Sequence, residues 1–152
     1  MLLLLIKHKV RIMGKLNNKI VAIDQARTTS NRLPNKVMHP ILGTPMIIHQ
    51  LDRINRSDHI DQLIVATSDH STDDELTQVC KGFGYNVSRG SFHNVVDRIW
   101  CAVEKVDYDQ LVRLSDDCPL KDAKIIDLLL GSIYRKARIT VQTLLCQLFL
   151  MY

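Results

Sequence analysis

Short apolar runs alternate with amphipathic, helix-length segments along most of this 152-residue chain. The apolar runs predict strands at residues 19–26, 62–67, 85–88 and 110–114. Helical spacing of apolar side chains predicts helices at residues 45–56, 71–84, 94–106 and 121–135. Such alternation is typical of a parallel sheet with helices on both faces, joined by right-handed crossovers. We therefore predict one α/β domain, a three-layer α/β/α sandwich with a mostly parallel sheet.

Composition narrows the functional class. The chain is 46% hydrophobic and 24% charged, as is usual for soluble globular proteins. Aromatic residues make up only 5% and the formal net charge is +4, which argues against a nucleic-acid surface. No apolar run approaches the ~18 residues of a membrane span, so we expect no membrane segment and a cytoplasmic location. The four cysteines form no Cys-x-x-Cys pair and predict neither a zinc site nor a disulfide framework.

A cationic loop follows the first predicted strand. Residues 25–36 carry Arg27, Arg32 and Lys36, and the spacing between the two arginines does not suit one face of a helix. Ligands of open α/β sheets bind at the carboxyl ends of the strands, where this loop begins. Guanidinium and ammonium groups there suit the phosphates of a nucleoside triphosphate. The alternative is a solvated surface turn with scattered cations.

Acidic residues follow two other predicted strands. Asp117 comes after the strand at 110–114, where a carboxylate suits Mg²⁺ that bridges phosphate oxygens. The alternative for Asp117 is a turn or helix cap. Asp69 follows the strand at 62–67, and its place fits contacts to a ribose or base. The acidic residues at 73–75 suit the first turn of the next helix.

Several motifs occur together in one order. They are Ala-Arg-x-x-Ser-x-Arg-Leu-Pro-x-Lys at 26–36, Leu-Gly-Thr-Pro-Met at 42–46, Val-Ala-Thr-Ser-Asp at 65–69, Arg-Gly-Ser at 89–91, Val-Asp-Arg at 96–98 and Asp-Cys-Pro-Leu at 117–120. From about residue 19 to residue 132 the chain resembles the cytidylyltransferases that activate acidic sugars as CMP-sugars. It is most similar to the spore-coat polysaccharide biosynthesis protein F branch, which is related to the CMP-Kdo and acylneuraminate cytidylyltransferases.

The resemblance implies a Rossmann-like, nucleotide-diphospho-sugar transferase fold and a reaction. CMP would pass from CTP to a sugar, pyrophosphate would leave, and Mg²⁺ would assist. By resemblance, the catalytic residues are Arg27, Lys36 and Asp117, with Asp117 as the metal ligand. The nucleotide-binding residues implied are Ala26, Arg27, Ser30, Arg32, Lys36, Asp69, Ser115 and Asp116. The intact family implies a homodimer.

The sequence departs from the family pattern at three places. Ser115-Asp116-Asp117 stands where Thr-Gly-Asp is usual, so Asp116 either weakens triphosphate binding or supplies a second metal ligand. Asp24 lies inside an apolar strand where the family has a neutral residue, and a buried carboxylate needs a partner. Asn35 replaces a usual Gly, and Asn tolerates the left-handed conformation better than most residues.

Both ends of the chain differ from the middle. We interpret residues 1–12 as a dispensable extension, with Met13 as an alternative start, and residues 13–136 as the nucleotide-binding domain. The resemblance fades after about Tyr134, and residues 137–152 are interpreted as an aberrant tail of a truncated or frameshifted gene. The family's downstream part supplies the sugar pocket, a second metal carboxylate and much of the dimer contact. Activity therefore stays open. The alternatives are a non-catalytic remnant that binds a nucleotide or a protein partner, and a nucleotidyltransferase that uses another nucleotide.

Overall fold

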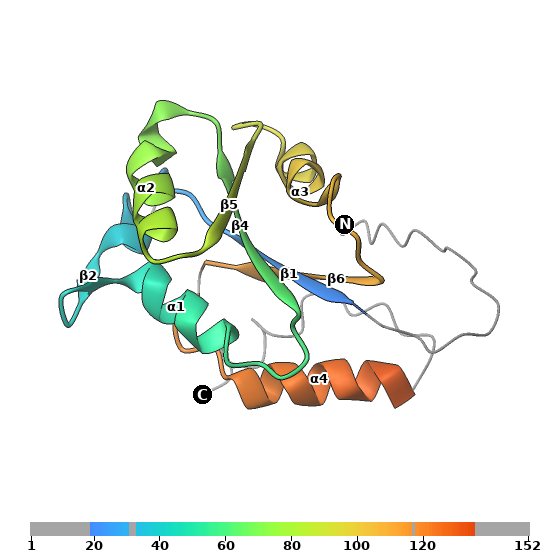
Figure 1. Cartoon of the computed structure of the whole chain (residues 1–152). Helices are drawn as coiled ribbons and strands as arrows, with labels where there is room; N and C mark the ends of the chain where they lie inside the picture. Colours follow the sequence, from blue (N-terminus) through green and yellow to red (C-terminus); the bar gives the residue numbers. More distant parts are fainter. Residues whose placement is uncertain (1–18, 31–32, 117, 136–152) are drawn as a thin grey trace.

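A four-stranded parallel sheet forms the centre of the molecule (Figure 1). The computed structural model describes residues 19–30, 33–116 and 118–135, with side chains to residue 131. The strands of the sheet, in spatial order, are β5 (Asn86–Gly90), β4 (Gln62–Ser68), β1 (Ile20–Gln25) and β6 (Gln110–Ser115). All three strand pairings are parallel. The predicted mostly parallel α/β sheet is therefore confirmed.

Helices cover both faces of this sheet, as the three-layer prediction requires. They are α1 (Met46–Ile54), α2 (Asp74–Gly82), α3 (Val95–Val103) and α4 (Ala123–Arg135). Successive side chains of a strand point to opposite faces. Ile20 and Ala22 of β1 accordingly pack in one core with α1, α2 and α4, whereas Val21 and Ile23 pack in a second core with α3. Figure 1 shows α3 alone on its side of the sheet.

A small hairpin before α1 was not predicted. Its strands are β2 (Pro40–Ile41) and β3 (Thr44–Pro45), which pair antiparallel around positive φ angles at Leu42 and Gly43. Pro45, predicted as the first helical residue, instead ends β3, with φ −54° and ψ 139° as the cap of α1. The backbone N–H of Met46 then donates to the His39 carbonyl at 2.9 Å. These contacts hold the chain extended up to Pro45.

Two helices begin later than predicted. The turn before α2 is the 3₁₀ helix η2 (Ser71–Asp73). Helix α4 starts at Ala123 because Asp122 caps it: its carboxylate accepts from the Lys124 N–H at 2.8 Å. Lys121, predicted inside the helix, is 6% exposed and points back toward the sheet. None of the helices within the described ranges has the length and hydropathy that a bilayer crossing requires.

The register of the sheet aligns the ends of its strands. Gln25 at the end of β1 lies opposite Ala66 of β4 and Ser115 of β6. Ser68 at the end of β4 lies opposite Gly90 of β5. The loops that follow these strands therefore leave the sheet along one edge.

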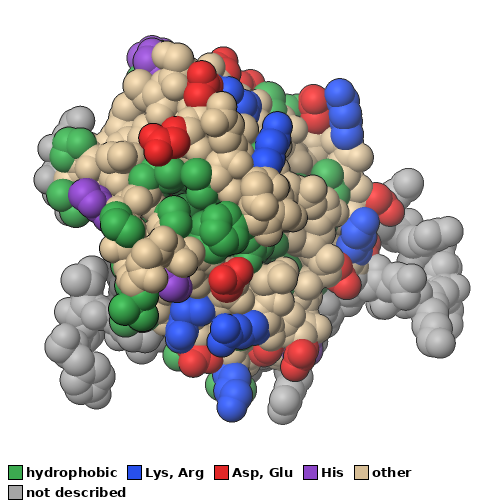
Figure 2. All heavy atoms as spheres, turned by 60° about the vertical axis from the view of Figure 1, so that its left-hand side comes forward, with side chains coloured by type: hydrophobic (Ala, Val, Ile, Leu, Met, Phe, Trp, Pro, Cys, Tyr) green, Lys and Arg blue, Asp and Glu red, His purple; other side chains and the backbone are tan. Residues whose placement is uncertain are grey.

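On the side of the molecule shown in Figure 2, hydrophobic side chains lie among basic and acidic ones, with basic side chains gathered below them.

Candidate functional site

The carboxyl edge of the sheet gathers those predicted site residues that the structure describes. Ala26 follows β1 directly and is buried, and its N–H donates to the Ala66 carbonyl at 3.2 Å. Arg27, the next residue, is exposed. Asp69 follows β4 and is exposed, with its N–H donating to the Gly90 carbonyl at 2.9 Å. Since ligands of open α/β sheets bind beyond the carboxyl ends of the strands, this edge is the candidate site.

The cationic loop after β1 is closed by its own backbone. The N–H groups of Ser30 and Asn35 both donate to the Thr28 carbonyl, at 3.0 and 2.8 Å. Asn35 has φ 58° and ψ 21°, so the left-handed conformation expected from the sequence is confirmed. The Ser30 hydroxyl accepts from the Leu33 N–H at 3.4 Å, which gives Ser30 a role in shaping the loop. Arg32 lies outside the described residues.

Asp73, the residue before α2, holds this loop through hydrogen bonds to Thr28. Its carboxylate accepts from the N–H of Thr28 at 2.8 Å and from the Thr28 hydroxyl at 2.7 Å. Its other oxygen accepts from the N–H of Ser68 at 3.3 Å and from the Ser68 hydroxyl. Burial alone would raise the pKa of Asp73, but the hydrogen bonds from Ser68 and Thr28 outweigh it, and the pKa lies below its ordinary value. An ionised, fully buried carboxylate thus joins the loops after β1 and β4.

Lys36 and Asp116 meet at the same edge. The Lys36 ammonium lies 3.5 Å from an Asp116 carboxylate oxygen, and their side chains are 21% and 14% exposed. The Asp116 N–H donates to the Gln25 carbonyl at 3.2 Å, which fixes the start of the β6 loop beside β1. The structure therefore brings two predicted residues from distant motifs into contact. Asp117, predicted as the metal ligand, lies outside the described residues.

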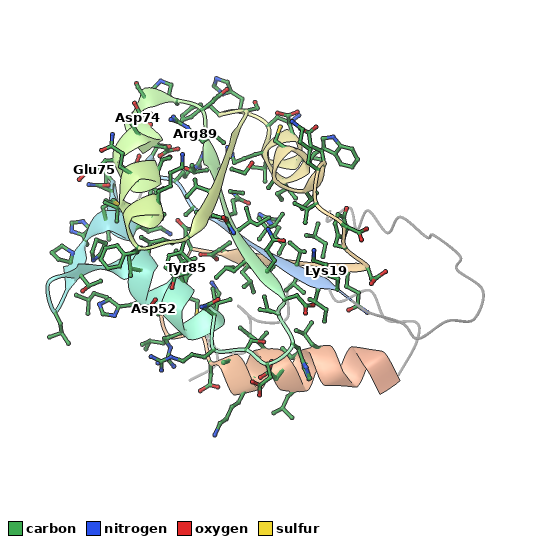
Figure 3. All side chains as sticks on the ribbon, in the orientation of Figure 1. Lys19, Asp52, Asp74, Glu75, Tyr85 and Arg89 are labelled. Atoms are coloured by element: carbon green, nitrogen blue, oxygen red, sulfur yellow. The ribbon has the colours of Figure 1, made fainter. Side chains whose placement is uncertain are left out.

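The arginines of the motifs at 89–91 and 96–98 donate hydrogen bonds to main-chain carbonyls of neighbouring loops. Arg89 donates to the carbonyls of Ser68 and His70, both at 2.9 Å, and pairs with Asp74 at 2.7 Å. Figure 3 shows Arg89 and Asp74 side by side at the top of the sheet. Arg98 is buried and donates to the carbonyls of Ser91 and Phe92. Burial and the nearby positive charge of Arg27 lower the pKa of Arg98.

Asp24 has the partners that its buried position demanded. The Gln50 side-chain amide donates to one carboxylate oxygen at 2.6 Å, and the Lys121 ammonium lies 3.6 Å from the other. The sequence pattern indicates no role for Gln50 or Lys121, and for Asp73 it indicates only a place in the first turn of a helix. The available signal for Gln50 was a polar side chain among the apolar positions of the helix at 45–56. Asp73 and Lys121 gave no such signal, because the contacts of Asp73 with Thr28 and of Lys121 with Asp24 join parts of the chain that are far apart in sequence.

Comparison with known proteins shows which family the chain resembles. The family described as cytidylyltransferase matches residues 21–145. The chain is 36% identical to the spore coat polysaccharide biosynthesis protein SpsF of Bacillus subtilis over 117 residues, 74% of this chain and 49% of that protein. A cytidylyltransferase structure from Leptospira borgpetersenii superposes with a TM-score of 0.74 at 34% identity, covering 80% of this chain and 52% of that one. A CMP:2-keto-3-deoxy-manno-octonic acid synthetase solved with CTP superposes with a TM-score of 0.71 at 27% identity, covering 80% and 50%.

These matches define the class as nucleotidyltransferase-like α/β proteins. Within it, the chain belongs to the cytidylyltransferase family. The chain spans about half the length of the relatives that it matches. The family match runs to residue 145, past Tyr134, where we expected the resemblance to fade. The expected extension at residues 1–12 and the tail at 137–152 lie outside the described residues.

Proposed function

We propose that this chain binds CTP at the carboxyl edge of the sheet and transfers CMP to an acidic sugar. The observation that carries the proposal is the contact between Lys36 and Asp116 at 3.5 Å, next to the loop that bears Arg27. This contact joins the motif at 26–36 to the loop after β6 at the edge where α/β sheets bind ligands. The CTP-bound relative, which covers 80% of this chain, supports the choice of nucleotide.

Each residue has a separate part in the proposed reaction. A sugar hydroxyl loses its proton to solvent and attacks the α-phosphorus of CTP, a new P–O bond forms, and the bond to the β-phosphate breaks to release pyrophosphate. Arg27 and Lys36 neutralise charge on the triphosphate and orient it, since positioning and charge stabilisation supply most of the catalysis of such transfers. Ala26 and Ser30 shape the backbone around the phosphates, with Arg32 in support. Asp69 is placed to contact the ribose or base.

Asp116 changes the electrostatics at the β6 end of the site. In the free protein its carboxylate neutralises part of the Lys36 charge. A triphosphate that binds Lys36 must compete with Asp116, unless a cation sits between the phosphate and the carboxylate. Both consequences of Asp116 that the sequence left open therefore depend on whether a metal is bound.

Mg²⁺ suits the chemistry of this edge. Within the described ranges, no three His, Cys, Asp or Glu side chains lie together as a metal cage. Mg²⁺ commonly binds through one or two carboxylates together with substrate phosphates and water, rather than through such a cage. We propose that Asp117 and Asp116 hold it. When bound, the ion would offset charge on the phosphates.

Turnover tests this proposal. Purified protein is incubated with CTP and Mg²⁺ and a panel of acidic sugars, and pyrophosphate release is followed. The proposal predicts release that requires both CTP and one of the sugars and that is lost in Lys36→Ala. Release that occurs equally with ATP, GTP or UTP would assign the site to another nucleotidyltransferase reaction.

A second function is a binding domain that does not turn over. It is favoured by one observation, that the Asp116 carboxylate faces Lys36 at 3.5 Å and so competes with a triphosphate for that ammonium. In this case CTP binds with a measurable dissociation constant, but no sugar in the panel supports pyrophosphate release. A homodimer is proposed only for a protein with the full family length.

A further inference from the structure

A buried polar cluster lies beneath the end of β6. Asp24 and Gln50 are fully buried, and Lys121 is 6% exposed. Asp24 follows Ile20 and Ala22 on the face of β1 that packs against α1 and α4. Gln50 comes from α1, and Lys121 comes from the segment before α4. Three elements thus place polar side chains inside an otherwise apolar core.

All three side chains converge on the Ser115 end of β6. The Gln50 amide donates to the Ser115 carbonyl at 3.1 Å as well as to Asp24. The Lys121 ammonium also donates to the Ser115 carbonyl while it faces Asp24. Asp24 therefore orients two donors, and both donors hold the last main-chain carbonyl of the strand.

The far end of the same segment is tied to α1. Arg53, one turn after Gln50, donates from Nε to the Lys121 carbonyl at 2.8 Å and from Nη2 to the Leu120 carbonyl at 3.5 Å. The Lys121 N–H donates to the Cys118 carbonyl at 3.3 Å. Helix α1 consequently holds the segment at both Ser115 and Lys121.

The cluster is not what a core selected only for stability would contain. Buried ion pairs can often be replaced by well-packed apolar side chains without loss of stability. The Gln50 Oε1 atom is buried and has no hydrogen-bond partner among the described residues. An unpaired buried polar atom is unfavourable for folding. What the cluster provides instead is a fixed position for a piece of main chain.

That piece of main chain leads directly into the candidate site. After Ser115, the Asp116 N–H donates to the Gln25 carbonyl, and the Asp116 carboxylate faces Lys36. We propose that Asp24, Gln50 and Lys121 are positioning residues that hold Ser115 and Asp116 in register with the loop that bears Arg27 and Lys36. The consequence for CTP rests on the proposed function, whereas the ordering of the β6 end does not.

The test replaces the buried pair by apolar side chains. The variant Asp24→Val/Lys121→Met removes both charges together and keeps the volume similar, so it avoids the unpaired charge that either single change leaves. Lys105→Met is the matched control, because Lys105 is exposed and, among the residues that the structure describes, its ion pair is with its neighbour Glu104 at 3.9 Å. Melting temperature reports stability, and hydrogen exchange at the Asp116 amide reports the order of the β6 end.

We expect the double variant to melt close to the wild-type protein while the Asp116 amide exchanges about tenfold faster or more. If the double variant folds stably and its Asp116 amide exchanges at the wild-type rate, the proposal is overturned and the cluster has only a packing role. If the double variant does not fold, Gln50→Met decides, since it removes one donor to Ser115 and keeps the ion pair. Faster Asp116 exchange in Gln50→Met supports positioning, and unchanged exchange refutes it.

A nucleotide measurement separates this inference from the proposed function. If wild-type protein binds CTP, the double variant should bind it about tenfold more weakly, and Lys105→Met should bind it as wild type does. A double variant with faster exchange but wild-type CTP affinity would show that order at the β6 end does not affect nucleotide binding. That result would overturn the proposed consequence for CTP. If wild-type protein binds no nucleotide, the proposed function fails, and the exchange result alone still decides the positioning role.

Discussion

At the scale of single residues, Asp73 determines how the loop after β1 is held. It accepts four hydrogen bonds from Thr28 and Ser68 and is fully buried. These bonds fix the backbone of Thr28, which directly follows Arg27. The exposed position of the Arg27 guanidinium therefore depends on a carboxylate that contacts no ligand in the proposed mechanism.

Asp73→Asn should destabilise the protein. An amide places an NH₂ group where Asp73 now only accepts, and hydrogen bonds to a charged acceptor contribute about 1.5–3 kcal/mol each. We expect the free energy of unfolding, measured in urea, to fall by about 2 kcal/mol or more. Asp74→Asn is the control, because its pair with Arg89 is solvent-exposed and should be worth ~1 kcal/mol or less. Equal losses in the two variants would contradict the account.

The same residue predicts a dependence on pH. Because folding lowers the pKa of Asp73 below 3.8, its contribution to stability is present above that value and is lost as the pH falls through the folded pKa. The difference in melting temperature between wild type and Asp73→Asn should be constant from about pH 7 to 5 and shrink below about pH 4. A difference that stays constant in the acid range would show that Asp73 is not ionised in the folded protein.

Asn35 makes the turn before Lys36 possible. Its φ of 58° lies in the left-handed region, where a β-branched side chain is strained. Asn35→Val should cost about 1–2 kcal/mol of unfolding free energy, and Asn35→Gly should cost little. Chemical denaturation of the two variants measures this. A Val variant as stable as the Gly variant would contradict the left-handed turn.

At the scale of elements, β5 and α3 approach closely at Gly90. A Cβ atom added there would lie 2.8 Å from the Cα of Arg98, so the backbone of the helix or the strand would have to move. We expect Gly90→Ala to lower the free energy of unfolding by about 1–3 kcal/mol, as overpacking does. Gly82→Ala is the control, since apart from its chain neighbours and the backbone of its own helix no described atom lies within 4 Å of its added Cβ. A neutral Gly90→Ala would mean that the two elements are farther apart.

The main elements could be predicted from the sequence because their signals are local. Apolar alternation and helical spacing gave all four sheet strands and all four helices. The hairpin β2–β3 was missed because each of its strands has two residues, too few for a periodic signal. The start of α4 was misplaced because Lys121 is held by contacts to the Ser115 carbonyl and to Asp24, and Asp24 is distant in sequence.

At the scale of the whole molecule, the site is a product of parallel topology. The described parts of the loops after β1, β4 and β6 lie together because these strands all end at one edge. The motifs predicted which residues would gather there, and the contact between Lys36 and Asp116 agrees. The supporting contacts of Asp73, Gln50 and Lys121 were beyond prediction, because they depend on which side chains of packed helices meet the strand ends.

A thermal-shift series with CTP, ATP, GTP and UTP, each with and without Mg²⁺, is the direct test of whether the carboxyl edge of the sheet binds CTP. A ligand at a hundred times its dissociation constant adds ~2.7 kcal/mol of stability. We predict that CTP with Mg²⁺ raises the melting temperature by several degrees, that the other nucleotides do so less, and that Arg27→Ala abolishes the shift. A protein that melts cooperatively and shifts with no nucleotide would contradict the assignment of this edge as a CTP site.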